Sequence, residues 1–386
     1  MSKQRHWLAL VTVLAIAFVL RPAVAQIGPI LSQIQDGLGV SNTEMAILTA
    51  VPVLCFGFGA FASPALVRRF GINHSMVYLL LILLVAVAVR PYIGFFGLLI
   101  GSTVAGLAIA VANVLLPSIV RERFADKVVV MTTAYTTVLA ASASFAAAIS
   151  FPSAVFGGWQ FSLAIWALPT LLAVVLSFSL LKGHEAAVEP SHEDHSAQWT
   201  AVWVSPITWW VTALFGLQSL GFYALLAWLP TVAIAAGVDP AGAGVLLSLM
   251  TIIGVPVRFF LAPVLHKWFN QSVEGVLISL LTAVGMALML FGLWIPAVIM
   301  IGIGQASSFP LSLSLIATRA KSMELTTILS SVVQGVGYLI AAAGTFLFGW
   351  LGSATKNWQI SIYLIIGVTL VQVVSGWYSG KDRVIG

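Results

Sequence analysis

Long apolar stretches alternate with short polar segments along the whole chain. The apolar stretches, each bounded by charge, glycine or proline, cover residues 7–32, 44–66, 75–90, 94–119, 129–151, 159–181, 203–230, 241–265, 273–292, 294–318, 325–351 and 358–379. Because a membrane-spanning helix needs about 20 predominantly apolar residues, the pattern predicts twelve spans. We therefore expect an all-α integral membrane protein, with tilted or kinked helices where the spans contain proline.

Composition narrows the class of protein further. Of the 386 residues, 60% are hydrophobic and 8% are charged, whereas soluble domains carry about 25% charged residues. These values exclude a soluble globular protein. The single cysteine, Cys55, lies within an apolar stretch, so the chain has neither a disulfide nor a zinc-ligand spacing.

Basic residues concentrate on alternate loops between the predicted spans. Thirteen of the 17 lysines and arginines lie on one set of loops and at the chain ends, namely Lys3, Arg5, Arg68, Arg69, Arg121, Arg123, Lys127, Lys182, Lys267, Arg319, Lys321, Lys381 and Arg383. The opposite loops hold only Arg90 and Lys356. Because basic loops stay on the cytoplasmic side, we expect a multi-pass protein of the cell membrane with both termini in the cytoplasm. These short clusters form no basic stripe, so no nucleic-acid partner is expected.

The N-terminus imitates a secretory signal peptide. Lys3 and Arg5 precede an apolar run that ends in Ala23-Val24-Ala25, which has the small-residue pattern of a cleavage site. Apolar character resumes at residues 27–31, and cleavage would remove one helix of the duplication described next. We expect the segment to be retained as the first span.

The two halves of the chain match each other at a nearly constant offset. A shift of 199 residues places Pro64–Phe70 on Pro263–Phe269 and Trp159–Ser162 on Trp358–Ser361, and a shift of 198 places Gly106, Arg121 and Arg123 on Gly304, Arg319 and Lys321. The repetition predicts two parallel, pseudo-symmetric six-helix bundles, over residues 1–182 and 201–386. Residues 183–200 are the expected cytoplasmic linker.

The expected linker contains two histidines three residues apart, His192 and His195. Such a pair can share a helix face and bind a metal, but the segment offers no third ligand and no buried shell around the pair. A solvated connector is the preferred interpretation. No metal and no cofactor are predicted.

Motifs in both halves resemble one known family. They are Leu20-Arg21-Pro22 with Gly28-Pro29, Leu48–Val53, Arg68–Gly71, Asn113–Pro117, Ala227–Pro230, and Leu329-Ser330 with Gln334–Tyr338. Over nearly its whole length the chain resembles transporters of the major facilitator superfamily, and more closely its cyanate permease and 2-nitroimidazole transporter branch. The resemblance implies transport by alternating access, with the first, fourth, seventh and tenth spans lining a central cavity.

Three positions depart from this pattern. Val67 stands where the superfamily usually has an aspartate before the arginine pair, although the branch tends to lack that residue. The glycine motif of antiporters survives only as Pro152 with Gly157-Gly158, which leaves the direction of transport open. Arg258 matches no feature of the branch.

Arg21 is the strongest candidate for substrate binding. A guanidinium near a span centre costs about 2.5–3.5 kcal/mol on insertion scales, and every Asp and Glu lies in a loop or at a span end. The carbonyl that Pro22 releases one turn back offsets part of this cost. A water-filled cavity that receives an anion is the better explanation, because arginine donates two parallel hydrogen bonds to planar oxyanions.

Arg258 is the second arginine within a span. Its face also carries Gly244, Ser248, Thr251 and Ala262 at helical spacing, which predicts a cavity residue. The alternative is that the side chain reaches toward the cytoplasm, a path of roughly 12 Å at 1.5 Å per residue.

Neutral polar residues in the predicted spans complete the candidate binding site: Asn113, Gln218, Tyr223, Gln305, Ser308, Gln334 and Tyr338. The resemblance supports Gln334 and Tyr338 in particular. For each of them, a hydrogen bond that joins two spans is the structural alternative.

The predicted function is secondary transport of a small anion or a polar planar nitrogen compound, such as a cyanate-like, nitroimidazole-like or small carboxylate molecule. All six histidines lie outside the spans or at their ends, so no dedicated proton relay is visible.

A multidrug-type exporter of neutral aromatic compounds is the alternative, followed by a polytopic membrane enzyme or a channel. The expected partners are the small-molecule substrate and the lipid bilayer, with the protein acting as a monomer.

Overall fold

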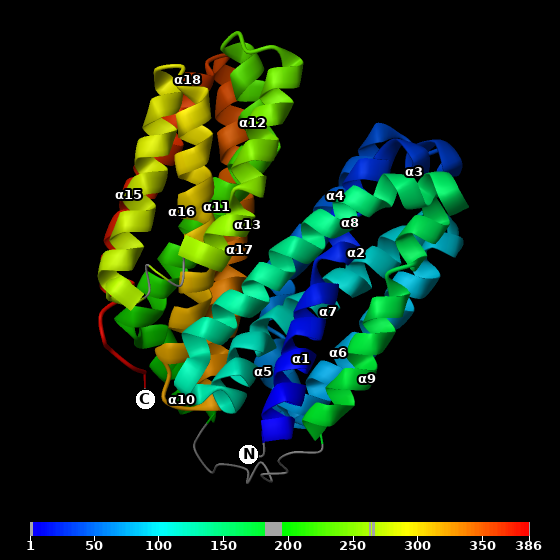
Figure 1. Ribbon diagram of the computed structural model, residues 1–386, viewed down its shortest axis with the longest axis vertical. Coiled ribbons are helices and arrows are strands. Elements are labelled where there is room, and N and C mark those ends of the chain that lie inside the picture. The colour runs from blue at the N-terminus through cyan, green and yellow to red at the C-terminus, as the bar shows by residue number, and fades with distance from the viewer. Residues whose placement is uncertain (1–2, 182–194, 262–263, 265–266, 386) are drawn as a thin grey trace. The chain divides into compact units, whose positions relative to one another are not determined.

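The computed structural model describes residues 3–181, 195–261, 264 and 267–385, and these fold almost entirely into helices (Figure 1). They divide into two compact units. The first comprises Met1–Asp126 and Ala134–Trp199, and the second comprises Lys127–Thr133 and Thr200–Gly386.

Helices of very different length build the first unit. They are α1 (Lys3–Leu20), α2 (Pro22–Ala25), η1 (Gly28–Ile30), α3 (Leu31–Leu38), α4 (Asn42–Ala60), α5 (Ser63–Phe70), α6 (Ile72–Val89), η2 (Arg90–Tyr92), α7 (Gly94–Arg123), η3 (Ala125–Lys127), α8 (Val128–Ala164), α9 (Ala167–Leu181) and α10 (His195–Val204). The first residues of α8, up to Thr133, and the last residues of α10, from Thr200, belong to the second unit. Within this unit, α7 packs against α4 and α6, and α9 packs against α1 and α6 (Figure 1).

The predicted first span, 7–32, is a broken helix. Pro22 has no N–H and cannot continue the hydrogen-bond ladder of α1. The chain therefore restarts at Arg21, whose carbonyl accepts bonds from the N–H groups of Val24 (3.1 Å) and Ala25 (3.0 Å). The pieces α1, α2 and η1 together form one apolar segment, Trp7–Ile30, of membrane-spanning length.

The fifth and sixth spans are joined without the loop expected at residues 152–158. Helix α8 continues past Pro152 and bends at Gly158, which has a φ of 82°. Glycine adopts this left-handed conformation at little cost because it has no Cβ. The single residue Gly158 turns the chain, so no polar loop is needed between the two spans.

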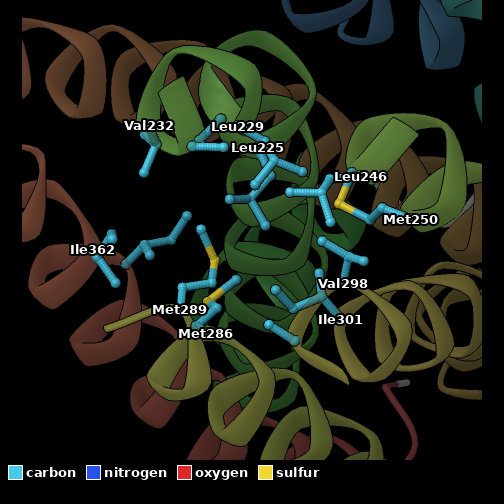
Figure 2. Close-up of a cluster of buried hydrophobic side chains, with 14 of the residues drawn as sticks. Leu225, Leu229, Val232, Leu246, Met250, Met286, Met289, Val298, Ile301 and Ile362 are labelled. Carbon is cyan, nitrogen blue, oxygen red and sulfur yellow. The ribbon is translucent and has the colours of Figure 1, made fainter. Parts of the chain in front are cut away.

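The second unit is built around α11 (Pro206–Ala235) and α17 (Met323–Thr355), which pack against each other along their length. Around them lie α12 (Pro240–Ile252), α13 (Gly254–Pro256), the π-helical turn η4 (Val257–Leu261), α15 (Gln271–Leu290), α16 (Trp294–Thr318) and α18 (Trp358–Ser379). Its core is aliphatic. Figure 2 shows side chains from α11, α12, α15, α16 and α18 meeting there, including Leu225, Leu246, Met286, Val298 and Ile362.

The described helices match the predicted spans. Among the described residues, nine segments are individually long and apolar enough to cross a membrane, and one of these, Ala125–Leu181, contains both the fifth and the sixth spans. The second and eighth spans correspond to α4 and to the interrupted series α12, α13 and η4. Large apolar side chains such as Phe156 and Phe291 are exposed, as expected of surfaces that face lipid. The fold is that of an all-α membrane protein with twelve spans in two six-helix bundles.

Hydrogen bonds reproduce the sequence duplication in three dimensions. Ser162 donates to the carbonyl of Ser150 at 2.9 Å. Its counterpart Ser361 donates to the carbonyl of Phe348 at 2.8 Å. The same contact therefore recurs at offsets of 199 and 198 residues, once in each unit.

Arginines at the ends of the fourth and tenth spans also make equivalent contacts. Arg123 donates to the carbonyl of Leu180, at the end of α9, and Arg319 donates to the carbonyl of Ser379, at the end of α18. By these contacts Arg123, rather than Arg121, is the counterpart of Arg319. Burial lowers the pKa of Arg319, while the carboxylate of Asp382, 3.7 Å away, opposes that shift.

Part of the expected linker is helical. Residues 195–200 belong to α10. Residues 183–194, with His192, lie outside the described residues. The described part of the chain contains no group of three or more potential metal-ligating side chains.

Candidate functional site

Arg21 lies at the break in the first span. It is the residue that precedes α2, with Pro22 as the first helical position. The side chain is half-buried, and its guanidinium carbon lies 5.8 Å from the centroid of the Phe56 ring on α4. An aromatic face attracts a cation at this distance, so Phe56 is one of the groups that position Arg21.

Small residues bring α4 close to α7 beside this arginine. A Cβ on Gly106 would lie 3.1 Å from Pro52 Cα, and one on Gly59 would lie 2.8 Å from the Cβ of Ala110. The predicted cavity face of the fourth span, with Gly106 and Ala110, therefore serves at least in part to pack two helices of the same unit.

Asn113 lies on α7 one turn before Pro117, with 7% of its surface exposed. Pro117 lacks the N–H that would bind the Asn113 carbonyl in a regular helix. Residue 113 thus marks a position where α7 can present both a side-chain amide and a backbone carbonyl outside the helical ladder.

Two of the candidate glutamines in the second unit have internal partners. Gln218 on α11 is 2% exposed and donates to Ser219 Oγ at 2.7 Å. Gln334 on α17 is equally buried and donates to Ser330 Oγ at 2.8 Å. Both side-chain amides are therefore oriented by a hydroxyl of their own helix.

Gln305 on α16 differs from these two glutamines. It is 5% exposed, and neither its Oε1 nor its Nε2 has a hydrogen-bond partner among the described residues. Gly221 makes room for the amide, because a Cβ at that position would lie 2.9 Å from Gln305 Nε2. A buried amide without partners costs about 1–3 kcal/mol, so this residue carries a free donor and a free acceptor at the expense of stability.

The candidate hydroxyl groups have more ordinary surroundings. Ser308 donates to the carbonyl of Gly304 at 2.8 Å, within its own helix. The Tyr338 ring meets Phe215 edge to face at 5.2 Å, and Phe215 lies 5.9 Å from Phe309. The Tyr223 ring is half-buried and packs edge to face on Phe222 at 5.4 Å. Tyr338 thus belongs to an aromatic cluster shared by α11, α16 and α17.

Arg258 contacts the tenth span. Its Nε donates to the carbonyl of Ala306 at 3.2 Å. Ala306 lies four residues before Pro310, and proline cannot supply the N–H that this carbonyl would normally accept. Arg258 therefore supplies the donor that Pro310 lacks, a role that neither of the two sequence interpretations had included.

One buried arginine escaped the sequence analysis. Arg90 was expected in a loop, but only 2% of it is exposed. It donates from Nη2 to the carbonyl of Ala23 at 2.8 Å and from Nη1 to Ser102 Oγ at 3.1 Å. Arg90 stands directly before Pro91 at the end of an apolar stretch, which is typical of a loop. The small and polar pair Gly101-Ser102, which contacts Arg90, is the one sequence signal of a buried site.

The candidates fall into three groups, each within one unit. Arg21 and Phe56 lie together in the first unit, and Arg90, in η2, binds the broken first span at the Ala23 carbonyl. In the second unit, Arg258 donates to the carbonyl of Ala306, the residue after Gln305, while Gln334 and Tyr338 lie on α17, and Tyr338 belongs to the aromatic cluster.

Comparison with known proteins assigns the family. Residues 10–342 match the Major Facilitator Superfamily. The uncharacterized transporter YycB of Bacillus subtilis (strain 168) is 34% identical over 392 residues, which cover 99% of this chain and 95% of that protein.

Two relatives from Escherichia coli (strain K12) have named substrates. The 2-nitroimidazole transporter is 29% identical over 384 residues, covering 97% of this chain and 95% of the relative. The cyanate transport protein CynX is 27% identical over 379 residues, covering 94% and 95%.

Solved structures agree on the fold. The Major Facilitator Superfamily transporter FucP, in its outward conformation, superposes with a TM-score of 0.79 at 12% identity, over 97% of this chain and 99% of that one. The proton:xylose symporter XylE gives the same TM-score at 13% identity, over 98% and 96%. With its twelve apolar spans, its duplicated bundles and this match over most of its length, the chain belongs to the Major Facilitator Superfamily of membrane transporters.

Proposed function

We propose that the protein is a secondary transporter for a small anion or a polar planar nitrogen compound, with Arg21 as the anchor for the substrate. Cyanate-like, nitroimidazole-like and small carboxylate compounds are the substrate classes. The two bundles alternate between inward-open and outward-open states around this site. The protein lies in the cytoplasmic membrane with both termini in the cytoplasm, and it works as a monomer.

The observation that carries the proposal is the placement of Arg21. A permanently charged side chain lies at the break of the first span, where the backbone leaves its regular ladder, with the Phe56 ring beside it. Arginine at such a place binds planar oxyanions through two parallel hydrogen bonds. The names of the two relatives from Escherichia coli support the same substrate classes.

The second bundle carries its own buried neutral groups, which the proposal also assigns to substrate recognition. The Gln305 amide has no hydrogen-bond partner in the part of the chain that the structure describes, and Gln334, Gln218 and Tyr338 are buried on α17 and α11. These groups suit a compound with a ring nitrogen, a nitro group or a carboxylate. In this proposal Arg258 affects transport indirectly, by stabilising α16 at Ala306, because its Nε already donates to the Ala306 carbonyl.

Export of neutral aromatic compounds is the second candidate function. The contacts among Phe215, Phe309 and Tyr338 favour it, because such a cluster stacks on aromatic rings without requiring charge. The two candidates differ in whether Arg21 is needed.

Transport into proteoliposomes tests the proposal. Uptake of cyanate, 2-nitroimidazole and a panel of small carboxylates is measured for the unaltered protein, for Arg21→Gln and Arg21→Lys, and for the exposed control Arg69→Gln. We expect Arg21→Gln to lose at least about tenfold in apparent affinity, as loss of a charged hydrogen bond predicts, and Arg69→Gln to lose none. Full affinity in Arg21→Gln, together with transport of neutral aromatic compounds, would favour the second candidate.

A further inference from the structure

Arg90 is a buried cation next to the proposed anchor but not part of it. Its side chain is among the largest that are almost fully buried. No carboxylate lies within ion-pair distance of it among the described residues. Its two hydrogen bonds go to a backbone carbonyl and a hydroxyl, and its Nε has no partner in this part of the chain. A buried charge needs a compensating partner, so the burial of Arg90 among neutral groups requires an explanation.

The carbonyl that Arg90 binds belongs to the short helix α2. In a regular helix, the Ala23 carbonyl would accept from the N–H of Ile27, but that N–H instead donates to the carbonyl of Val24 at 3.3 Å. The Ala23 carbonyl is therefore released at the C-terminal end of α2, and Arg90 takes the place of the missing donor at 2.8 Å. A cation is favourable here, because carbonyl groups at a helix C-terminus carry partial negative charge.

Helix α7 has the matching shape on the other side of this guanidinium. Ser102 accepts the second hydrogen bond at 3.1 Å. Gly101 admits the side chain, since a Cβ there would lie 2.4 Å from Arg90 Cβ. Arg90 thus connects the broken first span to the fourth span through a site that the neighbouring residues are shaped to hold.

The two ends of α2 are consequently controlled by two arginines. The Arg21 carbonyl accepts the first hydrogen bonds of α2, and the Arg90 side chain binds the Ala23 carbonyl, two residues after Arg21. With only four residues, α2 has no stability of its own. Whatever holds its C-terminal end also sets the direction in which the Arg21 side chain leaves the backbone.

We propose that Arg90 is a positioning residue for the anion site: it holds the break of the first span so that Arg21 faces the substrate. This inference rests on the proposed function of Arg21. Arg90 does not touch the substrate, and its effect on transport passes entirely through residue 21.

A double-mutant cycle in proteoliposomes tests this, with 2-nitroimidazole and cyanate as probes. Arg90→Gln removes the charge and the paired donors, and Ser102→Ala is the matched control that leaves the Ala23 bond in place. We expect Arg90→Gln to raise the half-saturating concentration about tenfold, as for loss of a charged hydrogen bond, with a much smaller change in maximal rate. Ser102→Ala should change it about threefold at most, because the bond from Arg90 to the Ala23 carbonyl, which holds α2, remains.

The cycle is closed in a background that lacks the anchor. If Arg90 acts through Arg21, the pair Arg21→Gln/Arg90→Gln has the same half-saturating concentration as Arg21→Gln alone, since coupled residues are not additive. A merely structural role predicts that Arg90→Gln contributes its full factor in both backgrounds, which would overturn the proposal. Where Arg90→Gln is not recovered as folded protein, Arg90→Lys takes its place, because lysine keeps the charge without the fork that spans both acceptors.

A measurement without substrate separates this proposal from the proposed function. With the only cysteine replaced, Cys55→Ser, a thiol is introduced by Arg21→Cys, and its reaction rate with the anionic reagent 2-sulfonatoethyl methanethiosulfonate is measured with arginine or glutamine at position 90. We expect Arg90→Gln to change the rate at least about threefold, since thiol reactivity follows local exposure and charge, while Arg69→Gln leaves it unchanged. A rate independent of residue 90 would overturn the positioning role. A changed rate combined with normal transport in Arg21→Gln would retain the positioning role and reject Arg21 as the anchor.

Discussion

The two arginines within spans, Arg21 and Arg258, have different surroundings. Arg21 lies at a helix break beside an aromatic ring, whereas Arg258 donates to the Ala306 carbonyl that Pro310 leaves without its helical donor. In the sequence both are arginines inside an apolar stretch, and nothing local separates them. The difference comes from the neighbouring span, α4 for Arg21 and α16 for Arg258.

Replacing Arg258 tests its bond to the Ala306 carbonyl. Arg258→Gln removes the donor that satisfies the Ala306 carbonyl, and a hydrogen bond from a charged group contributes about 1.5–3 kcal/mol. We expect a lower melting temperature in detergent and an unchanged order of preference across a panel of anions, with the exposed Lys267→Gln as control. An altered order of preference would instead assign Arg258 to the substrate site.

Replacing Gln305 should lower transport without lowering stability. Gln305→Leu removes two buried polar groups that have no partner in the described structure, so the melting temperature should stay constant or rise, whereas transport should fall by about tenfold if the amide serves the ligand. Gln334→Leu is the comparison, because it breaks a bond to Ser330 and should lower the melting temperature. A Gln305→Leu variant with full transport would remove the residue from the proposed site.

At the scale of the helix, interruptions rather than lengths distinguish this chain. The first span breaks at Arg21-Pro22, the fifth and sixth join through Gly158, and the eighth is divided into α12, α13 and η4. Apolar runs predict where a span lies because the bilayer requires them. Continuation of α8 through residues 152–157 was missed, because proline, serine and glycine in that segment have the composition of a loop.

The close contact between α15 and α18 predicts how sensitive stability is to a single added methyl group. Helices α15 and α18 touch through Gly275 and Gly376, where a Cβ on Gly376 would lie 2.7 Å from the backbone carbon of Gly275. Gly376→Ala should therefore force the two backbones apart and lower stability by about 1–3 kcal/mol. Gly367→Ala, on the same helix but with no atom within 4 Å of the new Cβ, should leave stability unchanged. Equal melting temperatures for the two variants would contradict this account of the packing.

The whole molecule is a duplicated structure, and its two units repeat contacts as well as helices. The serine bonds at Ser162 and Ser361 and the arginine bonds at Arg123 and Arg319 occupy the same places in each bundle. The sequence offset predicted the duplication. The offset of 198 paired Arg121 with Arg319, whereas the contacts pair Arg123 with Arg319, because one offset does not hold throughout the chain.

Energy coupling belongs to this scale too. The spans contain no Asp or Glu near their centres, and the histidines lie outside the spans or at their ends. We therefore expect flux of a monoanion through proteoliposomes to respond to an imposed membrane potential, with a driving force of about 2.3 kcal/mol per 100 mV. A pH gradient imposed without a potential should drive only compounds that carry the proton themselves. Uphill uptake of a permanently ionised anion, driven by pH alone, would require a proton relay within the protein.

The sequence by itself determined the number and order of the spans, the duplication and the anomaly of Arg21. These features follow from the bilayer, which demands apolar segments of set length and makes each charge inside them expensive. Only the tertiary structure decided that Arg90 is buried on the Ala23 carbonyl, that Arg258 donates to the Ala306 carbonyl, and that Ser308 is bonded within its own helix. The physical reason is that the acceptors of the two arginines lie on other spans, where the local backbone leaves these carbonyls without their usual helical donors. Even a bond within one helix, as at Ser308, depends on how the side chain packs.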